Sequence, residues 1–487
     1  MRKKITAIIL AAAVAMPFAA CAMPEEEERT RYDINAELSK DNVLTASVSI
    51  DYVNNSDVSH DELWFNLYPN AYREGATFCP IPSDKIIAAY PNGRNYAKLD
   101  IQSVEVGGKQ VEHTVGGADE NVLIVPLENK LEPSERVTVE VEYTLKLPNV
   151  KHRLGYNNKS VNLANFYPIA CVYSGGEFKA DPYYSVGDPF YSECADYNVT
   201  LTVPDKYTGA FTGEVKSENE AEDGKIFVIK ANNVRDFAAV LGEYEKASGL
   251  AGTTVVNYYY YSDTAPEKAL NTAIDAINVF SDMFGEYPYP EYSVVQTSFI
   301  HGGMEYPNLS MISDSYVSDA YNDIIVHETA HQWWYGVVGN DEVHYAWLDE
   351  GLTEYSTMLF YDKADGYNYT FDGKRADALA AYMLYCETYK NNGLGDTSMT
   401  RAVNEYEGDI EYSYMTYVKG ALMFDDVRNA VGDAAFFGGL KNYYRDRKYK
   451  IARPEHLIGA IEKSSRTRVG ELFDSWLNGN VKLYSKN

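Results

Sequence analysis

One short motif constrains this chain more than any other feature of its sequence: His327-Glu328-Thr329-Ala330-His331. Residues at positions i and i+4 lie on one face of a helix, so a helix through this segment aims both imidazoles at a single metal ion. Glu328 then lies one position round the helix, close enough to act on a water at that ion. Apolar residues flank the motif, and Gly336 and Gly339 follow it, which predicts a core helix that ends near these glycines.

A third candidate ligand lies downstream. Eighteen residues separate His331 from Glu350, and the segment 347–362 has the pattern of a second helix. Two His and one Glu leave the fourth coordination position open for water, which is the arrangement of a catalytic zinc site rather than a structural one. The sequence therefore predicts one Zn²⁺ per chain, bound by His327, His331 and Glu350. Glu328 is the predicted general base.

Glu354 is a candidate for supporting this metal site. It lies four residues after Glu350, so on a helix the two carboxylates face the same way. A carboxylate in that position can accept the free N–H of a zinc-bound histidine. The alternative is a solvated carboxylate on the surface of the helix.

The charge balance excludes several classes of partner. The 487 residues include 71 Asp+Glu against 43 Lys+Arg, which gives a formal net charge of −28. Affinity for nucleic acid comes mainly from Lys and Arg on phosphates, and peripheral binding to anionic lipid also needs basic residues. Such a negative field attracts basic or amine-bearing ligands instead. We therefore expect no nucleic-acid partner.

The N-terminus has the pattern of an export signal. Arg2-Lys3-Lys4 precedes an uncharged apolar run from Ile5 to Ala20, as in the basic and hydrophobic regions of a secretory signal. The run ends in Phe18-Ala19-Ala20-Cys21, in which small residues before a cysteine resemble a bacterial lipobox.

This pattern predicts a signal peptide over residues 1–21 and a tether over residues 22–31. Cys21 is then the lipidation site, and the protein is exported and anchored to the membrane at the cell surface. Ordinary cleavage after Ala22, which would give a secreted protein, is the alternative.

Three regions follow the tether. Residues 32–246 contain runs of alternating polar and apolar residues separated by glycine turns, which predicts an antiparallel β domain. Val255 to Tyr261 reads as its last strand, and Pro266 opens a helical pattern. Residues 247–395 are expected to form a mixed catalytic domain, and residues 396–487 a short, mainly helical region. The predicted fold class is therefore multidomain α+β.

Two further motifs occur in order around the metal-binding pattern: Gly302-Gly303-Met304-Glu305-Tyr306 upstream and Tyr417-Val418-Lys419-Gly420-Ala421 downstream. Together with HExxH, an 18-residue gap and Glu, they resemble the gluzincin aminopeptidases, the membrane alanyl aminopeptidase and leukotriene hydrolase family. The resemblance covers about residues 32 to 480. It implies a saddle-shaped N-terminal β domain, a thermolysin-like zinc domain and a C-terminal helical region, which is short here and leaves the site more open.

The resemblance also implies roles for individual residues. Glu305 matches the glutamate that binds the free α-amine of the substrate, and Tyr417 matches the tyrosine that stabilises the oxyanion. Gly302, Gly303 and Met304 match the strand that lies beside the substrate.

Two tyrosines carry less certain implications from the family pattern. Tyr412 matches a second site tyrosine of some relatives, or is one more tyrosine in a tyrosine-rich chain. Tyr306 departs from the family, which has Asn there. From that departure we expect weaker binding of the substrate N-terminus.

The expected function is that of a zinc-dependent aminopeptidase acting on peptides with free N-termini. A zinc endopeptidase of thermolysin type shares HExxH and a distant Glu but does not need Glu305. A non-catalytic surface-binding protein on the same scaffold is the remaining alternative, although such proteins usually lose a ligand or the base.

Overall fold

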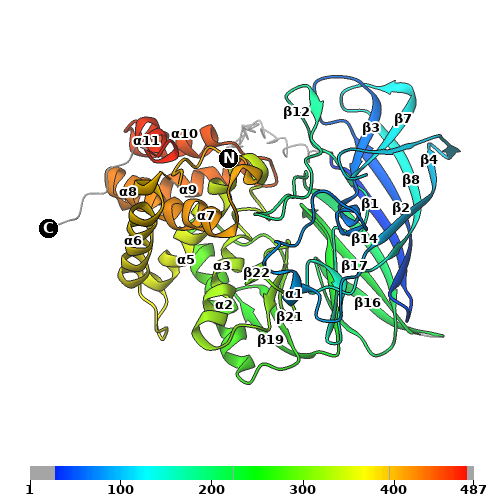
Figure 1. The fold of residues 1–487 in the computed structure, drawn as a ribbon, viewed down its shortest axis with the longest axis horizontal. Helices are drawn as coiled ribbons and strands as arrows, with labels where there is room; N and C mark the ends of the chain where they lie inside the picture. The colour runs from blue at the N-terminus through cyan, green and yellow to red at the C-terminus, as the bar shows by residue number, and fades with distance from the viewer. Residues whose placement is uncertain (1–27, 223, 394, 480–487) are drawn as a thin grey trace, which may run out of the picture.

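The computed structural model describes residues 28–222, 224–393 and 395–479 of the chain. Figure 1 shows a β-rich N-terminal part on one side, a central mixed part, and a helical C-terminal part on the other side. The predicted α+β fold with an N-terminal β domain and C-terminal helices is confirmed. Cys21 and the predicted signal segment lie outside the described residues, so both remain predictions.

An eight-stranded sheet is the largest element of the N-terminal part, with the order β16-β17-β14-β1-β2-β8-β4-β5. Its strands are β1 (Arg31–Leu38), β2 (Val43–Val53), β4 (Lys98–Val106), β5 (Lys109–Gln110), β8 (Arg136–Lys146), β14 (Ala195–Val203), β16 (Glu214–Ala221) and β17 (Gly224–Val234). In β1 every second side chain is buried, from Tyr32 to Leu38, and the intervening ones face outward. The period of two therefore identified which face packs on the core.

The expectation of a wholly antiparallel N-terminal domain is wrong at one strand pair. β1 runs parallel to β14, with Arg31 opposite Asp196, although its other neighbour β2 is antiparallel. Only short hairpins force adjacent strands to be antiparallel, and β1 and β14 are far apart in the chain. Alternation within a strand carries no information about the direction of its partner.

Smaller sheets complete the N-terminal part. One has the order β15-β18-β10-β9, another β11-β3-β7-β6, and β12 pairs with β13. Their bounds are β3 (His60–Asn66), β6 (Thr114–Gly116), β7 (Val122–Leu131), β9 (Leu154–Tyr156), β10 (Ser160–Ala164), β11 (Ile169–Ala170), β12 (Tyr173–Ser174), β13 (Glu177–Phe178), β15 (Thr208–Phe211) and β18 (Ala238–Gly242).

A five-stranded sheet begins the central part, in the order β19-β20-β21-β23-β22. Its strands are β19 (Glu245–Ala251), β20 (Thr254–Tyr260), β21 (Glu291–Thr297), β22 (Gly303–Met304) and β23 (Leu309–Ser313). The strand predicted at 255–261 is therefore not the last. β21 and β23 escaped prediction because they are parallel and buried almost throughout, and such strands do not alternate.

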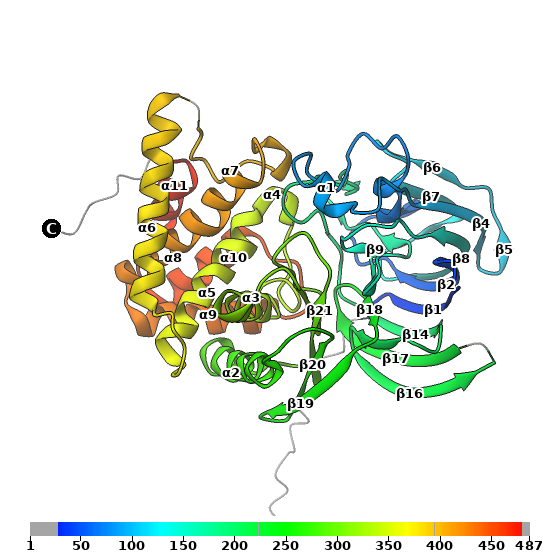
Figure 2. The same ribbon diagram turned by 60° about the horizontal axis from the view of Figure 1, so that its bottom comes forward.

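Helices cover this sheet and form the C-terminal part (Figure 2). They are α1 (Ile86–Ala89), α2 (Pro266–Phe284), α3 (Ser318–Ala330), α4 (Glu342–Ala346), α5 (Leu352–Lys363), α6 (Phe371–Thr388), α7 (Asp409–Ser413), α8 (Gly420–Val431), α9 (Asp433–Arg447), α10 (Pro454–Ser465) and α11 (Gly470–Leu477). α3 and α5 lie between the sheet and the C-terminal helices, where they are buried from both sides. None of the helices in the described ranges is long and apolar enough to cross a membrane.

Arg235 joins the three parts of the chain. Its guanidinium is buried and donates hydrogen bonds to the carbonyl oxygens of Ser192 (2.5 Å), Tyr335 (3.0 Å) and Lys450 (3.3 Å). Gly339 lies against it, because a Cβ at that position would come within 2.0 Å of the guanidinium carbon. The β-rich part is thus tied both to the loop after α3 and to the segment after α9.

We expect Arg235→Met to lower the free energy of unfolding by about 3 kcal/mol, because it leaves buried carbonyl groups without donors. The shift of the urea unfolding midpoint measures this. Arg445→Met is the matched control, since Arg445 is exposed and pairs only with its neighbour Asp446. Equal midpoints for the two variants would contradict the role given to Arg235.

Candidate active site

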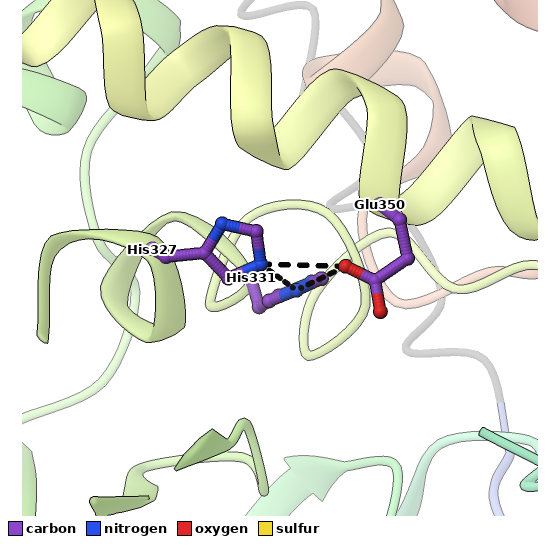
Figure 3. Close-up of side chains that lie close together, drawn as sticks. All are labelled: His327, His331 and Glu350. Carbon is purple, nitrogen blue, oxygen red and sulfur yellow. Dashed lines mark hydrogen bonds and ion pairs between the residues drawn. The ribbon is translucent and has the colours of Figure 1, made fainter. Parts of the chain in front are cut away.

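Three side chains converge at the end of α3 (Figure 3). The Nε2 atoms of His327 and His331 are 3.2 Å apart. Glu350 Oε2 lies 3.3 Å from the first of these atoms and 3.2 Å from the second. His331 and Glu350 are almost fully buried, and His327 is partly exposed to the neighbouring cavity.

These distances fit a tetrahedral zinc ion. With Zn–N and Zn–O distances of about 2.0–2.2 Å, the edges of a coordination tetrahedron are about 3.3–3.6 Å long. The three donor atoms lie 3.2–3.3 Å from one another, so they occupy one face of such a tetrahedron and leave its fourth corner open. The residues present therefore fit the predicted metal.

Each histidine is oriented by a second carboxylate. His327 Nδ1 lies 3.2 Å from Glu354 Oε2, and His331 Nδ1 lies 2.8 Å from Asp349 Oδ1. When each Nδ1–H donates to its carboxylate, the lone pair of Nε2 faces the metal position. Glu354 occupies the position that the sequence predicted. The contact of Asp349 was not predicted, although its place beside Glu350 was a usable signal.

The backbone around Glu350 differs from the expected continuous helix over 347–362. Glu350 lies in a π-helical turn, η2 (Trp347–Gly351), which leads directly into α5. α3 likewise ends at Ala330, before the glycines at which its end was expected, and His331 follows in its last turn. Isolated π-helical turns are common at functional sites, where they change the direction of a side chain on an otherwise regular helix.

Glu328 projects into the same cavity as the three donor atoms. Its side chain is 5% exposed, and Oε2 has no hydrogen-bond partner among the described residues. Burial raises the pKa of this carboxyl to about 7, and the neighbouring His327 and His331 partly offset that rise. A carboxyl with a pKa near 7 can both accept and return a proton at neutral pH.

Gly303 on β22 lies directly against Glu328. A Cβ at Gly303 would come within 2.4 Å of Glu328 Oε1, so only glycine allows the strand this close to the carboxylate. Gly302 and Gly303 both line the cavity, whereas Met304 is buried beneath it. β22 is the edge strand of its sheet, paired only with β23.

Glu305 follows this strand and faces the metal site. One of its carboxylate oxygens lies within 4.8 Å of ligand atoms of His331 and Asp349. The residue is 4% exposed, and Oε1 has no hydrogen-bond partner within the described part of the chain. Burial raises the pKa of Glu305 well above its ordinary value. A cationic group in the cavity would give this carboxylate the partner that it lacks.

Tyr417 reaches the site from the C-terminal part of the chain. Its hydroxyl donates a hydrogen bond to Glu350 Oε1, and its ring stacks on that of His327 with centroids 5.5 Å apart. Burial and the adjacent Glu350 raise the pKa of Tyr417 well above its ordinary value, so the phenol stays protonated as a donor. Tyr412 also lines the cavity and meets the Tyr417 ring edge to face.

The cavity holds about 440 Å³ and has walls from all three parts of the chain. Its lining includes two ion pairs that sequence reasoning did not identify. Arg153 pairs with Asp188 at the buried side, and Lys85 lies 2.6 Å from Asp409, which joins the segment before α1 to α7. Neither pair has a local sequence signature, because the partners are distant in the chain.

Tyr306 does not take the position expected for it. The ring is fully buried, its hydroxyl donates to Asn165 Oδ1 at 2.9 Å, and it packs near Phe190. It is absent from the cavity lining. The phenol therefore fills the boundary with the N-terminal part and does not crowd the region in front of Glu305.

The helix-borne HExxH pair with a glutamate from the following helical segment defines a gluzincin-type metallopeptidase centre. Residues 268–476 match the domain described as "Peptidase family M1 domain". The chain belongs through this domain to the gluzincin aminopeptidase family M1, as the sequence motifs indicated.

Relatives and solved structures agree with this assignment. The chain is 26% identical over 275 residues to Aminopeptidase M1-B of Oryza sativa subsp. japonica, which covers 51% of this chain and 30% of the relative. It is 22% identical over 403 residues to Aminopeptidase N of Lactobacillus delbrueckii subsp. lactis, which covers 78% of this chain and 46% of the relative. The chain thus spans less than half of either relative.

The fold is shared with the M1 zinc metallopeptidase from Deinococcus radiodurans. The TM-score is 0.67 at 18% sequence identity, with 94% of this chain and 95% of that chain covered. The likeness extends over the β-rich, central and helical parts together.

We expect the wild type to bind one zinc ion per chain and His331→Ala to bind none, because two donors cannot hold the ion at this site. Metal analysis by mass spectrometry after dialysis measures the stoichiometry. His344→Ala is the control, since His344 is exposed and pairs with Asp341. A full zinc content in His331→Ala would refute the ligand assignment.

Proposed function

We propose that this protein is a zinc-dependent aminopeptidase that removes N-terminal residues from peptides. The observation that carries the proposal is the position of the Glu305 carboxylate, which is buried and without a partner in the same cavity as the His327, His331 and Glu350 triad. A free α-ammonium group is the substrate feature that such a carboxylate recognises. The names of the aminopeptidase relatives support the same activity.

The metal would be held by the two Nε2 atoms and Glu350 Oε2, and when bound it supplies Lewis acidity toward water and the scissile carbonyl. Glu328 takes a proton from the attacking water at its free oxygen and returns that proton to the leaving amine. The Tyr417 hydroxyl donates to the oxygen on which negative charge develops. A donor of this type is typically worth about 3 kcal/mol of transition-state stabilisation.

Glu305 makes the reaction exopeptidic. A carboxylate at a fixed distance from the hydrolytic centre holds the N-terminal amine, so only the first peptide bond reaches Glu328. The strand β22 would run beside the substrate backbone, and Gly303 allows the substrate to approach Glu328 closely. A substrate solved in the Deinococcus radiodurans M1 neighbour is the tripeptide Tyr-Ser-Ala, a ligand with a free N-terminus of the kind proposed here.

We expect the wild type to hydrolyse aminoacyl-amides with a free amine and to leave N-acetylated counterparts almost untouched. Glu328→Gln should retain zinc but lose nearly all turnover, because an amide cannot accept the proton of water. Steady-state kinetics with both substrate series measure this. Efficient internal cleavage of N-acetylated peptides would favour the zinc endopeptidase instead, and activity of Glu328→Gln near the wild-type level would refute the base.

Glu305→Ala should reduce kcat/KM on free peptides roughly 10–100-fold, because a hydrogen bond to a charged group is worth about 1.5–3 kcal/mol. Glu305→Gln keeps the shape of the side chain and removes its charge, so it should lose nearly as much. Activity on blocked peptides should remain at its low level in both variants. A uniform loss on free and blocked peptides would show that Glu305 supports the fold rather than the amine.

We also propose that the protein is exported and anchored to the membrane by lipid on Cys21, where it acts on peptides near the cell surface. The support is the small-residue approach to Cys21 after the apolar run. Each buried CH₂ of an acyl chain contributes about 0.8 kcal/mol, so two or more chains hold the protein firmly. Mass spectrometry of the mature N-terminus should find lipidated Cys21, and Cys21→Ser should release the enzyme into the medium. An unmodified N-terminus at Met23 would instead indicate ordinary secretion.

A further inference from the structure

Two π-helical turns bring Glu350 and Tyr417 together. The turn η2 (Trp347–Gly351) carries Glu350 and leads into α5, and the turn η5 (Tyr414–Lys419) carries Tyr417 and leads into α8. Each turn therefore presents one site residue directly before a regular helix begins. Their backbones are distant in sequence, so the distance between them depends on how they pack.

The turns meet at two buried glycines. A Cβ at Gly420 would lie 2.7 Å from the Cα of Gly351, and a Cβ at Gly351 would lie 3.0 Å from the Cα of Gly420 and 2.9 Å from the carbonyl oxygen of Thr416. Ordinary van der Waals contacts of a Cβ begin at 3.4 Å. The backbones are thus closer than any pair containing a larger residue allows.

This contact lies immediately beside the interaction between the two site residues. Gly351 follows Glu350 directly, and Gly420 comes three residues after Tyr417, so the separation of the glycines sets the separation of these side chains. The Tyr417 hydroxyl donates to Glu350 Oε1 at this separation, and its ring stacks on His327.

A second contact fixes η5 from the opposite side. The Lys419 side chain is fully buried, and its ammonium donates to the carbonyl oxygens of Thr397 and Trp476. η5 is therefore held between the Gly351 backbone and the carbonyl groups that Lys419 reaches. A larger residue at the glycine contact cannot be accommodated by a simple shift of η5 toward Lys419.

We propose that Gly351 and Gly420 are positioning residues, whose backbone contact sets the reach of Tyr417 to the Glu350 carboxylate and to the oxyanion. The catalytic part of this inference rests on the proposed aminopeptidase function. Displacements of about 1 Å can cost roughly 100-fold in rate when a catalytic group is misplaced.

The test is a double-substitution cycle between Gly420→Ala and Tyr417→Phe. Alone, each substitution should reduce kcat roughly 10–100-fold with little change in KM, because each removes a donor that acts in the transition state. The double variant should be no slower than Tyr417→Phe alone. Losses that multiply in the double variant would overturn the proposal, since Gly420 would then act independently of Tyr417.

Gly439→Ala is the matched control. Gly439 lies in α9, and a Cβ there would come 2.9 Å from the Cα of Ile461, a contact almost as tight but between different helices. This variant should change the urea midpoint yet keep kcat and its response to Tyr417→Phe. Alanine normally favours a helix over glycine, so any loss must come from the new contact.

An independent readout uses the metal-free protein and needs no activity. Tyr417→Phe should shift the urea midpoint less in the Gly420→Ala background than in the wild type, because the hydrogen bond to Glu350 is already lost there. Equal shifts would overturn the proposal. An inactive wild type with unequal shifts would refute the aminopeptidase function and leave the positioning role supported.

Gly351→Ala, where the contact is slightly looser, is the second variant if Gly420→Ala does not fold. Its kcat should fall in the same way, with the zinc content unchanged. If neither variant folds while Gly439→Ala does, the contact serves folding alone and the proposal fails.

Discussion

Everything in the site depends on bringing two imidazole nitrogens and one carboxylate oxygen within 3.3 Å of one another without hydrogens between them. Each histidine must present a bare Nε2, which requires a hydrogen-bond acceptor for its Nδ1–H. Asp349 and Glu354 provide these acceptors. The acceptors and Glu350 come from one continuous segment, so η2 and α5 supply both a ligand and the groups that orient the other two.

The electrostatics of the cavity follow from this arrangement. Glu305 and Glu328 add buried carboxyl groups without hydrogen-bond partners for one oxygen each, and burying such groups uncompensated is costly. A divalent cation at the three donors changes that balance, because a bound ion is the largest local charge in its site. The ammonium group of a substrate would supply the remaining positive charge. Binding of metal and substrate is thus coupled to the same set of carboxylates.

The cavity is also a property of how the three parts of the chain pack. Arg235 ties the β-rich part to the loop after α3, and the Lys85–Asp409 pair joins it to α7 at the cavity wall. Tyr417 arrives from the C-terminal part through the glycine contact with η2. No part of the chain holds a complete site by itself, so movements between the parts would alter the reach of Tyr417 before they altered the metal ligands.

The sequence by itself determined the features that depend on local geometry. The spacing of four residues placed His327 and His331 on one face because the helix repeat fixes that relation, and alternation identified the buried face of β1. The resemblance to the gluzincin aminopeptidases added Glu305 and Tyr417 to the predicted site. Tertiary structure alone decided the parallel pairing of β1 with β14, the partner of Asp349, the burial of Tyr306 away from the cavity, and the contact of Gly351 with Gly420. These features join segments that are distant in the chain, and no periodicity within one segment encodes which other segment will pack against it.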